Sequence, residues 1–182
     1  QTSWRWATSA RWKTDVGDHE LALRLRHQFG GPWLGSWDNA RWRAQAAWTH
    51  DLPKGWKIMP LICYDLRFPV WARSKSSEEN LYEYDALIYV ANWPEPRVNA
   101  WDALLTARAI ENTSYCIGVN RVGDDGVGAH YVGHSAVYNY KGEQLAFSEK
   151  EEILYANLTK EDLLAFRKRF PFQADADDFE LR

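Results

Sequence analysis

The chain has 182 residues, enough for one globular domain with a sizeable core, because a domain of this length buries about 70% of the surface of its unfolded chain. Its net charge of -3 and pI near 6.0 leave no basic field for a polyanion, so we expect no nucleic-acid partner. It has two cysteines, no apolar run of membrane-spanning length and no signal-peptide pattern, so we expect a cytoplasmic protein without membrane contact.

The first 54 residues differ in composition from the rest of the chain. They hold seven of the eleven tryptophans but no Ile, Tyr or Met, and only residues 20–27 alternate well enough to predict a strand. One interpretation is a separate Trp-rich subdomain. The other is that this segment is not the native start of the domain and that the chain, which begins at Gln1, is a fragment or rearranged. Either way we predict an atypical segment at 1–54 and a second part at 55–182.

After this segment, short apolar runs alternate with helix-period segments, which is typical of an α/β fold. The runs that predict strands lie at 56–63, 84–91, 114–120, 134–140 and 151–158. Several are almost continuously apolar, which indicates strands covered on both faces. Helices are predicted at 98–113 and at 160–170. The second follows Thr159, which offers an N-cap with Asp162 three residues later, and it stops before Pro171.

Cys63 ends the first predicted strand, in the stretch "LICYDLRFPVW". A thiol at the carboxyl end of a strand, followed by a turn, can serve as a nucleophile, and the backbone N–H of Tyr64 could then form half of an oxyanion hole. The alternative is an inert buried thiol, because unpaired cysteine is among the most buried residue types. The pattern alone leaves both interpretations open.

Four stretches in sequence order carry a more specific signal: "GWKIMPLICYDLRFPVWAR", "YDALIYVANWPEPR", "AWDALLTARAIENTSYCIGVNRVGDDG" and "YVGHSAVYNYKGE". Together they resemble the nitrilase (carbon–nitrogen hydrolase) superfamily, and most closely its omega-amidase branch. The resemblance begins at about Gly55. It implies the C-terminal half of an α-β-β-α sandwich, incomplete at its N-terminal side, that forms a homodimer and needs no cofactor or metal. It also implies a Glu–Lys–Cys triad in which Cys63 is the nucleophile.

The implied reaction is hydrolysis of the terminal amide of a small carboxylic or 2-oxo acid, through a cysteine thioester and with release of ammonia. The residues expected around the substrate are Arg67, Asn92, Trp93, Pro94 and His134. Arg67, or alternatively Arg97, would hold a substrate carboxylate, since a planar guanidinium suits bidentate pairing. A local ion pair of Arg67 with Asp65 is the other interpretation. Trp93 is either a plug that closes its loop or a lid over the pocket.

The glutamate and lysine of the triad are not recognisable. Glu20 is the only glutamate before Cys63, and Lys13, Lys54 and Lys57 are the only lysines, none with the neighbours that the resemblance requires. Whether this chain is an active enzyme is therefore open. The alternative is a catalytically impaired homologue that acts as a dimerising or binding scaffold. We expect amidase activity of the 182-residue chain to be absent or severely impaired, because an unactivated cysteine is only a few per cent thiolate at pH 7.

Other conspicuous residues favour structural roles. His130 and His134 stand four residues apart but lack further ligands at metal-binding spacing, and we favour neither a metal site nor a Cys–His dyad with Cys63. We expect His134 to lie beside the substrate pocket or to pack in the core. Arg108 and Glu111 should form an ion pair on one helix that supports the site. Cys116, in the middle of a predicted strand, should be an inert core thiol.

Overall fold

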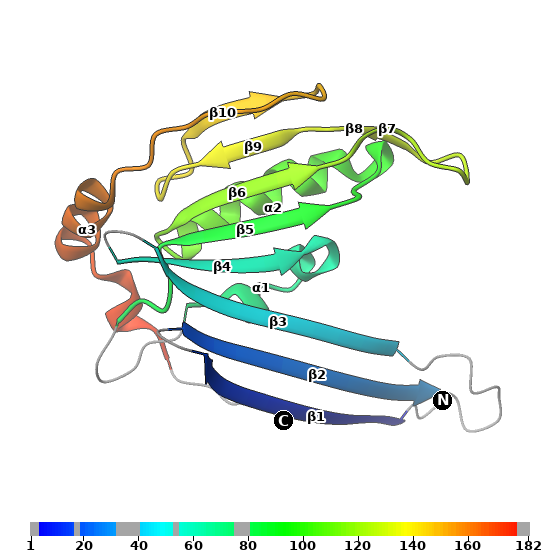
Figure 1. Ribbon diagram of the computed structural model, residues 1–182, viewed down its shortest axis with the longest axis horizontal. Helices are drawn as coiled ribbons and strands as arrows, with labels where there is room; N and C mark the ends of the chain where they lie inside the picture. The colour runs from blue at the N-terminus through cyan, green and yellow to red at the C-terminus, as the bar shows by residue number, and fades with distance from the viewer. Residues whose placement is uncertain (1–3, 17–18, 32–40, 53–54, 75–80, 178–182) are drawn as a thin grey trace. The chain divides into compact units, whose positions relative to one another are not determined.

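The computed structural model describes the backbone of residues 4–16, 19–31 and 41–52, and both backbone and side chains of residues 55–74 and 81–177. The chain divides into two compact units, Gln1–His50 and Asp51–Arg182. The first unit is an antiparallel arrangement of β1 (Trp4–Val16), β2 (His19–Gly31) and β3 (Arg41–Leu52) (Figure 1). Only the strand at 20–27 was predicted here. The flanking mixture of Trp, Arg, Ala and Ser lacks the period of 2 from which a strand is read.

The second unit is built on a mixed sheet with the strand order β4-β5-β6-β9-β10 (Figure 1). Its strands are β4 (Trp56–Ile62), β5 (Ala86–Ala91), β6 (Tyr115–Asn120), β9 (Ser135–Tyr138) and β10 (Gln144–Ser148). The first three are parallel to one another, and β9 and β10 continue the sheet in antiparallel fashion. Because parallel strands end at the same edge of a sheet, the residues that follow β4, β5 and β6 are brought together.

Helix α2 (Val98–Glu111) covers one face of this sheet (Figure 1). Its buried residues Trp101, Leu105 and Ala109 recur every four positions and so form one stripe along the helix. Gly118 of β6 allows the helix to lie close, because a Cβ there would be 2.7 Å from the Trp101 ring and would also overlap Leu105. Among the described residues no helix is both long and apolar enough to cross a membrane.

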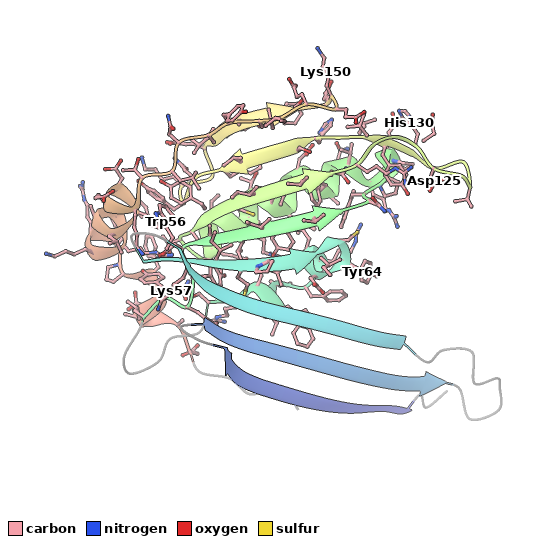
Figure 2. The ribbon with its side chains drawn as sticks, viewed as in Figure 1. Trp56, Lys57, Tyr64, Asp125, His130 and Lys150 are labelled. Atoms are coloured by element: carbon pink, nitrogen blue, oxygen red, sulfur yellow. The ribbon has the colours of Figure 1, made fainter. Side chains whose placement is uncertain are left out.

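Helix α3 (Lys160–Arg169) packs at the edge of the sheet where β4, β5 and β6 begin. The apolar cluster under it consists of Trp56, Ile58, Ala86, Tyr115, Tyr140, Leu158, Leu163 and Phe166. Figure 2 shows Trp56 and Lys57 at this end of β4, with Tyr64 beyond its opposite end. The carboxyl ends of the parallel strands are therefore remote from α3.

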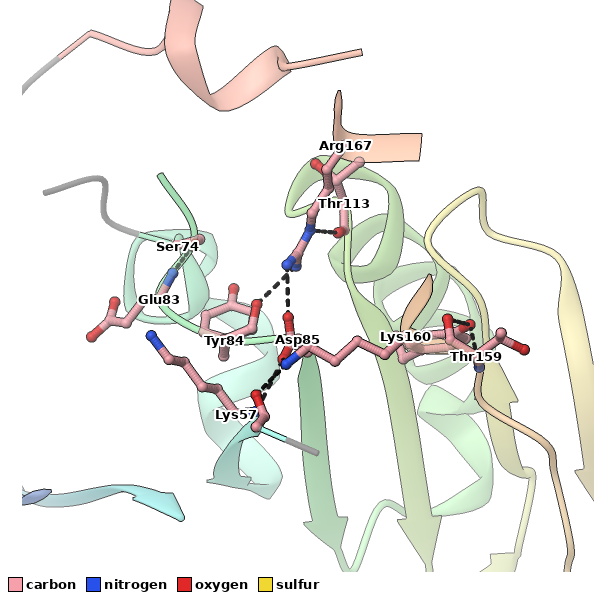
Figure 3. A network of polar contacts seen from close by, with 11 residues as sticks. Lys57, Ser74, Glu83, Tyr84, Asp85, Thr113, Thr159, Lys160 and Arg167 are labelled. Atoms are coloured by element: carbon pink, nitrogen blue, oxygen red, sulfur yellow. Dashed lines mark hydrogen bonds and ion pairs between the residues drawn. The ribbon is translucent and has the colours of Figure 1, made fainter. Parts of the chain in front are cut away.

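A buried polar network joins α3 to the start of β5 (Figure 3). The Asp85 carboxylate accepts hydrogen bonds from Arg167 at 2.8 Å and from the backbone N–H of Lys57 at 3.0 Å, and it forms an ion pair with Lys160 at 3.0 Å. Arg167 also donates to the carbonyls of Tyr84 and Thr113. Since Asp85 and Arg167 are both buried, their charges are satisfied by one another and by the backbone instead of by water.

Most of the predicted elements are confirmed, and the strand at 151–158 is wrong. That segment forms no strand, and its Ile153 and Tyr155 are 77% and 85% exposed. The strand lies earlier, at β10, whose polar and apolar residues do not alternate clearly in the sequence. A small hairpin of β7 (Val122–Asp124) and β8 (His130–Val132) was also missed, since each strand has only three residues.

Helix α3 starts where the capping pattern predicts, but a different interaction holds its first turn. Thr159 is the N-cap residue, and its side chain makes no capping hydrogen bond. Its backbone N–H instead donates to the Tyr115 hydroxyl at 3.1 Å, and that hydroxyl lies 3.1 Å from the Thr159 carbonyl. Contact with β6, and not the local capping box with Asp162, holds this helix terminus.

Candidate active site

Cys63 is the first residue after β4 and opens a short 3-10 helix, η1 (Cys63–Arg67). Its backbone φ is +30°, a conformation that side-chain-bearing residues adopt at a cost. The Asp65 carboxylate accepts the Ile62 N–H at 3.1 Å, and the Asp65 carbonyl accepts the Phe68 N–H at 3.0 Å. Asp65 therefore braces the turn on both sides of the cysteine.

Arg108 supports the same turn from α2. Its guanidinium donates to the Leu66 carbonyl at 2.5 Å and pairs with Glu111 at 2.8 Å, which confirms the predicted ion pair. Its side chain is only 3% exposed, so the bond to Leu66 forms in a water-poor environment. The strained backbone at Cys63 is thus held from the helix as well as from within the turn.

We predict that Cys63→Gly is more stable than Cys63→Ala by about 1 kcal/mol, because glycine adopts positive φ without steric cost. Both substitutions remove the thiol, so their difference isolates backbone strain. Urea unfolding followed by circular dichroism measures it. At Cys116, inside β6, the order should reverse, because glycine weakens a strand. The same order at both positions would contradict strain at Cys63.

The loop after β5 faces the cysteine. The Cys63 Sγ lies 3.9 Å from the Asn92 carbonyl oxygen, a weak contact in which the thiol is the donor. The next side chain, Trp93, is only 3% exposed and donates its indole N–H to the Arg97 carbonyl at 2.6 Å. The Arg67 guanidinium stacks 4.8 Å above the Trp93 ring. The burial of Trp93 favours the plug over the lid.

The other residues predicted around the substrate lie at the same edge of the sheet. Pro94 is half-buried and precedes the 3-10 helix η2 (Glu95–Arg97). Tyr64 is half-exposed, and its ring meets Phe68 edge-on at 5.4 Å. An oxyanion role for the Tyr64 N–H and a carboxylate-binding role for Arg67 stay predictions.

His130 and His134, which stand four residues apart in the sequence, are both paired with carboxylates. His134 Nδ1 lies 2.9 Å from Asp102 and its Nε2 lies 3.4 Å from Glu149. His130 Nδ1 lies 2.7 Å from Asp124, which raises the pKa of His130. The part of the chain that the structure describes contains no group of three or more His, Cys, Asp or Glu side chains that could hold a metal ion.

Cys116 is fully buried in β6, and burial raises the pKa of its thiol well above the ordinary value. It is therefore the core thiol that its position predicts. Cys63, by contrast, is partly exposed.

Among the residues whose side chains the structure describes, no glutamate or lysine makes a hydrogen bond with Cys63. The side chains of Glu20, Lys13 and Lys54 lie outside the described residues. Lys57 is described, but Figure 2 places it at the opposite end of β4 from Tyr64. It is therefore remote from the cysteine.

Asn120, the last residue of β6, is the polar side chain here that the sequence analysis missed. It is 6% exposed, and its carboxamide binds the backbone of Trp93 and of Gly133. One sequence signal could have indicated Asn120. It is a polar residue that ends the apolar run "YCIGVN", and the preceding predicted strand ends in the same way, at "ANWP".

Comparison with known sequences finds relatives over most of the chain. The carbon–nitrogen hydrolase family model matches residues 34–168. Omega-amidase YafV of Escherichia coli (strain K12) is 52% identical over 130 residues, which cover 70% of this chain and 48% of that protein. The 2-oxoglutaramate amidase of Bacillus subtilis (strain 168) is 35% identical over 118 residues, 64% of this chain and 44% of that protein. The chain spans about half the length of these curated relatives.

Solved structures are similar as well. XC1258 from Xanthomonas campestris, a CN-hydrolase superfamily protein with an arsenic adduct in its active site, has a TM-score of 0.71 and 32% identity. The match covers 97% of this chain and 71% of that one. Nit3 of Saccharomyces cerevisiae, a member of branch 10 of the nitrilase superfamily, has a TM-score of 0.62 and 25% identity over 85% of this chain and 59% of its own.

Proposed function

Since this chain belongs to the carbon–nitrogen hydrolase family and has the α/β fold of the nitrilase superfamily, we propose that it carries the nucleophile of an omega-amidase. The substrate class is the terminal amide of a small carboxylic or 2-oxo acid. Two relatives carry the names omega-amidase and 2-oxoglutaramate amidase, which supports this class. Arg67, the last residue of the turn that Cys63 opens, would pair with the substrate carboxylate.

The observation that carries the proposal is the backbone of Cys63. A partly exposed thiol stands at the carboxyl end of a parallel strand, at positive φ, on a turn braced by Asp65 and Arg108. Backbone strain held by its surroundings is typical of functional positions, and ligands of α/β sheets bind outside the carboxyl ends of the strands. A core thiol such as Cys116 shows none of these features.

The reaction proceeds in two acyl-transfer steps. The Cys63 thiolate attacks the amide carbon, and the carbonyl electron pair moves to oxygen, where the Tyr64 N–H would stabilise it. Collapse of the tetrahedral intermediate breaks the carbon–nitrogen bond, and the nitrogen leaves as ammonia after it gains a proton. Water then attacks the thioester, which releases the carboxylic acid and restores the thiol. The proton transfers need a general base and acid, which the family supplies with a glutamate.

A second candidate function is a binding or dimerising scaffold without chemistry. It is favoured by the surroundings of the sulfur. Among the described residues, no carboxylate or ammonium group makes a hydrogen bond with Cys63 Sγ, whose polar contact is the Asn92 carbonyl. An unassisted thiol would leave the pocket able to bind an amide but not to cleave it.

We also propose that the protein acts in the cytoplasm as a homodimer. We further propose that residues 1–54 form an atypical Trp-rich segment and that residues 55–182 form the C-terminal half of a carbon–nitrogen hydrolase domain. Both cysteines are unpaired, which suits a reducing compartment. Phe172, in the C-terminal tail, is 56% exposed and could pack on a partner subunit. Analytical ultracentrifugation tests the dimer, and a monomer at micromolar concentration would contradict it.

Thiol labelling distinguishes the two candidate functions. The chain and its Cys63→Ala variant are treated briefly with iodoacetamide at pH 7, and intact-mass spectrometry counts the adducts. An activated nucleophile should label at Cys63 roughly tenfold faster than cysteine in the same buffer, and buried Cys116 should stay unlabelled. Labelling of Cys63 no faster than that of cysteine supports the scaffold. Ammonia release from an omega-amide measures turnover directly, and we expect little or none from the 182-residue chain.

A further inference from the structure

The Asn92–Trp93 peptide group joins the candidate nucleophile to Asn120. Its carbonyl oxygen lies 3.9 Å from Cys63 Sγ, and its N–H donates to the Asn120 side-chain oxygen at 2.7 Å. The carbonyl and N–H of a trans peptide lie in one rigid plane and point in opposite directions. Whatever holds the N–H therefore also aims the carbonyl.

Asn120 is well placed to hold this peptide. Its side-chain NH₂ donates to the Trp93 carbonyl at 3.0 Å and to the Gly133 carbonyl at 2.7 Å. Its own N–H donates to the Ser135 hydroxyl at 3.1 Å, which fixes the backbone from which the carboxamide extends. Because the residue is 6% exposed, water offers no easy substitute for these bonds.

We propose that Asn120 is a positioning residue for Cys63. Through its hydrogen bond to the Trp93 N–H, it keeps the Asn92 carbonyl directed at the sulfur. That carbonyl accepts a weak hydrogen bond from the thiol S–H and so selects the resting rotamer of the side chain. The same carboxamide ties the loop after β5 to the segment before β9, so the orientation of the thiol depends on two loops that join at one buried amide.

This inference rests on the proposed function only in taking Cys63 as the nucleophile. The contact between its thiol and the Asn92 carbonyl can be measured without turnover. The S–H stretching band in the infrared spectrum reports whether a thiol donates a hydrogen bond, and the difference from Cys63→Ala assigns the band of Cys63. We expect Asn120→Leu to move that band to higher wavenumber. Asn120→Ala removes the same acceptor with a smaller side chain and should move the band in the same direction.

Asn139 supplies a matched control. It is also a buried asparagine, 8% exposed, whose carboxamide makes three hydrogen bonds, with Lys141 and Glu143 in the turn after β9. Asn139→Leu should leave the Cys63 band unmoved. Cys116, which is fully buried, reports general loosening, so its iodoacetamide labelling should stay absent in every variant.

An unmoved Cys63 band in Asn120→Leu, with Cys116 still protected, overturns the proposal. So does an equal shift in Asn139→Leu. If Asn120→Leu does not fold, Asn120→Ala decides: a band at higher wavenumber supports the proposal, and an unmoved band contradicts it. In a preparation that hydrolyses an omega-amide, Asn120→Leu should lower kcat by roughly 10- to 100-fold with KM changed little, as misplacement of a reacting group does. Slow labelling of Cys63 in the parent protein would count against the amidase and not against this contact.

Discussion

Replacing Asp85 with Ala is expected to lower the free energy of unfolding by about 3–5 kcal/mol, because it leaves a buried cation without its partner. The Arg167 guanidinium, 5% exposed, lies 2.8 Å from the Asp85 carboxylate. Burial lowers the pKa of Arg167, and the Asp85 charge opposes that shift. The variant also removes the acceptor of the Lys57 N–H, which helps to set the pairing of β4 with β5 (Figure 3). Urea unfolding measures the loss.

Two further variants test whether the loss of stability comes from the Asp85–Arg167 ion pair itself. Lys168→Ala, at an exposed position of the same helix, should change stability by less than about 0.5 kcal/mol. The double variant Asp85→Ala/Arg167→Met should cost less than the sum of the two single changes, because the buried guanidinium is removed together with its partner and only Lys160, whose side chain is 18% exposed, loses its carboxylate. Strict additivity in this cycle would show that Asp85 and Arg167 do not stabilise each other.

This network also shows the limit of sequence reasoning about the fold. Asp85 and Arg167 are 82 positions apart, and neither stands in a pattern that predicts a partner. The predicted strands at 56–63, 84–91 and 114–120 are confirmed, because buried parallel strands form apolar runs that can be read locally. The predicted strand at 151–158 fails for the converse reason. An apolar run there is exposed, and no local signal tells exposed from buried.

In the candidate site, too, some features could be predicted from the sequence and others depend on the folded structure. The family and fold inferred from the resemblance are confirmed, and the role of Cys63 as nucleophile stays a prediction that its neighbours in the sequence suggest. The ion pair of Arg108 with Glu111 follows from helical spacing, but the bond from Arg108 to the Leu66 carbonyl does not, since it depends on how α2 lies on the sheet. The role of Asn120 likewise needs the register of Ala91 with Asn120, which only the folded sheet provides.

Replacing Trp101 with Ala is expected to destabilise the protein by about 3–5 kcal/mol, the usual effect of deleting a large aromatic side chain from a core. Trp101 is fully buried between α2 and β6, and its ring centroid lies 5.6 Å from that of Trp93. Its indole N–H donates to the His134 carbonyl at 2.8 Å, so the variant also leaves an acceptor unpaired. Ile110→Ala, on the exposed side of the same helix, is the matched control and should cost far less.

The same substitution should loosen the site, because Trp101 lies behind the loop that faces the cysteine. In Trp101→Ala, the iodoacetamide labelling rate of Cys63 should change while Ile110→Ala leaves it as in the parent. Trp101→Phe, which keeps most of the ring volume but loses the indole N–H, should fall between Ala and the parent in stability. Gly118→Ala should be costly alone, by about 1–3 kcal/mol, and somewhat less costly beside Trp101→Ala, since its added methyl group would meet the Trp101 ring as well as Leu105. Equal costs in the two backgrounds would mean that Leu105, and not Trp101, sets how closely α2 approaches β6 at Gly118.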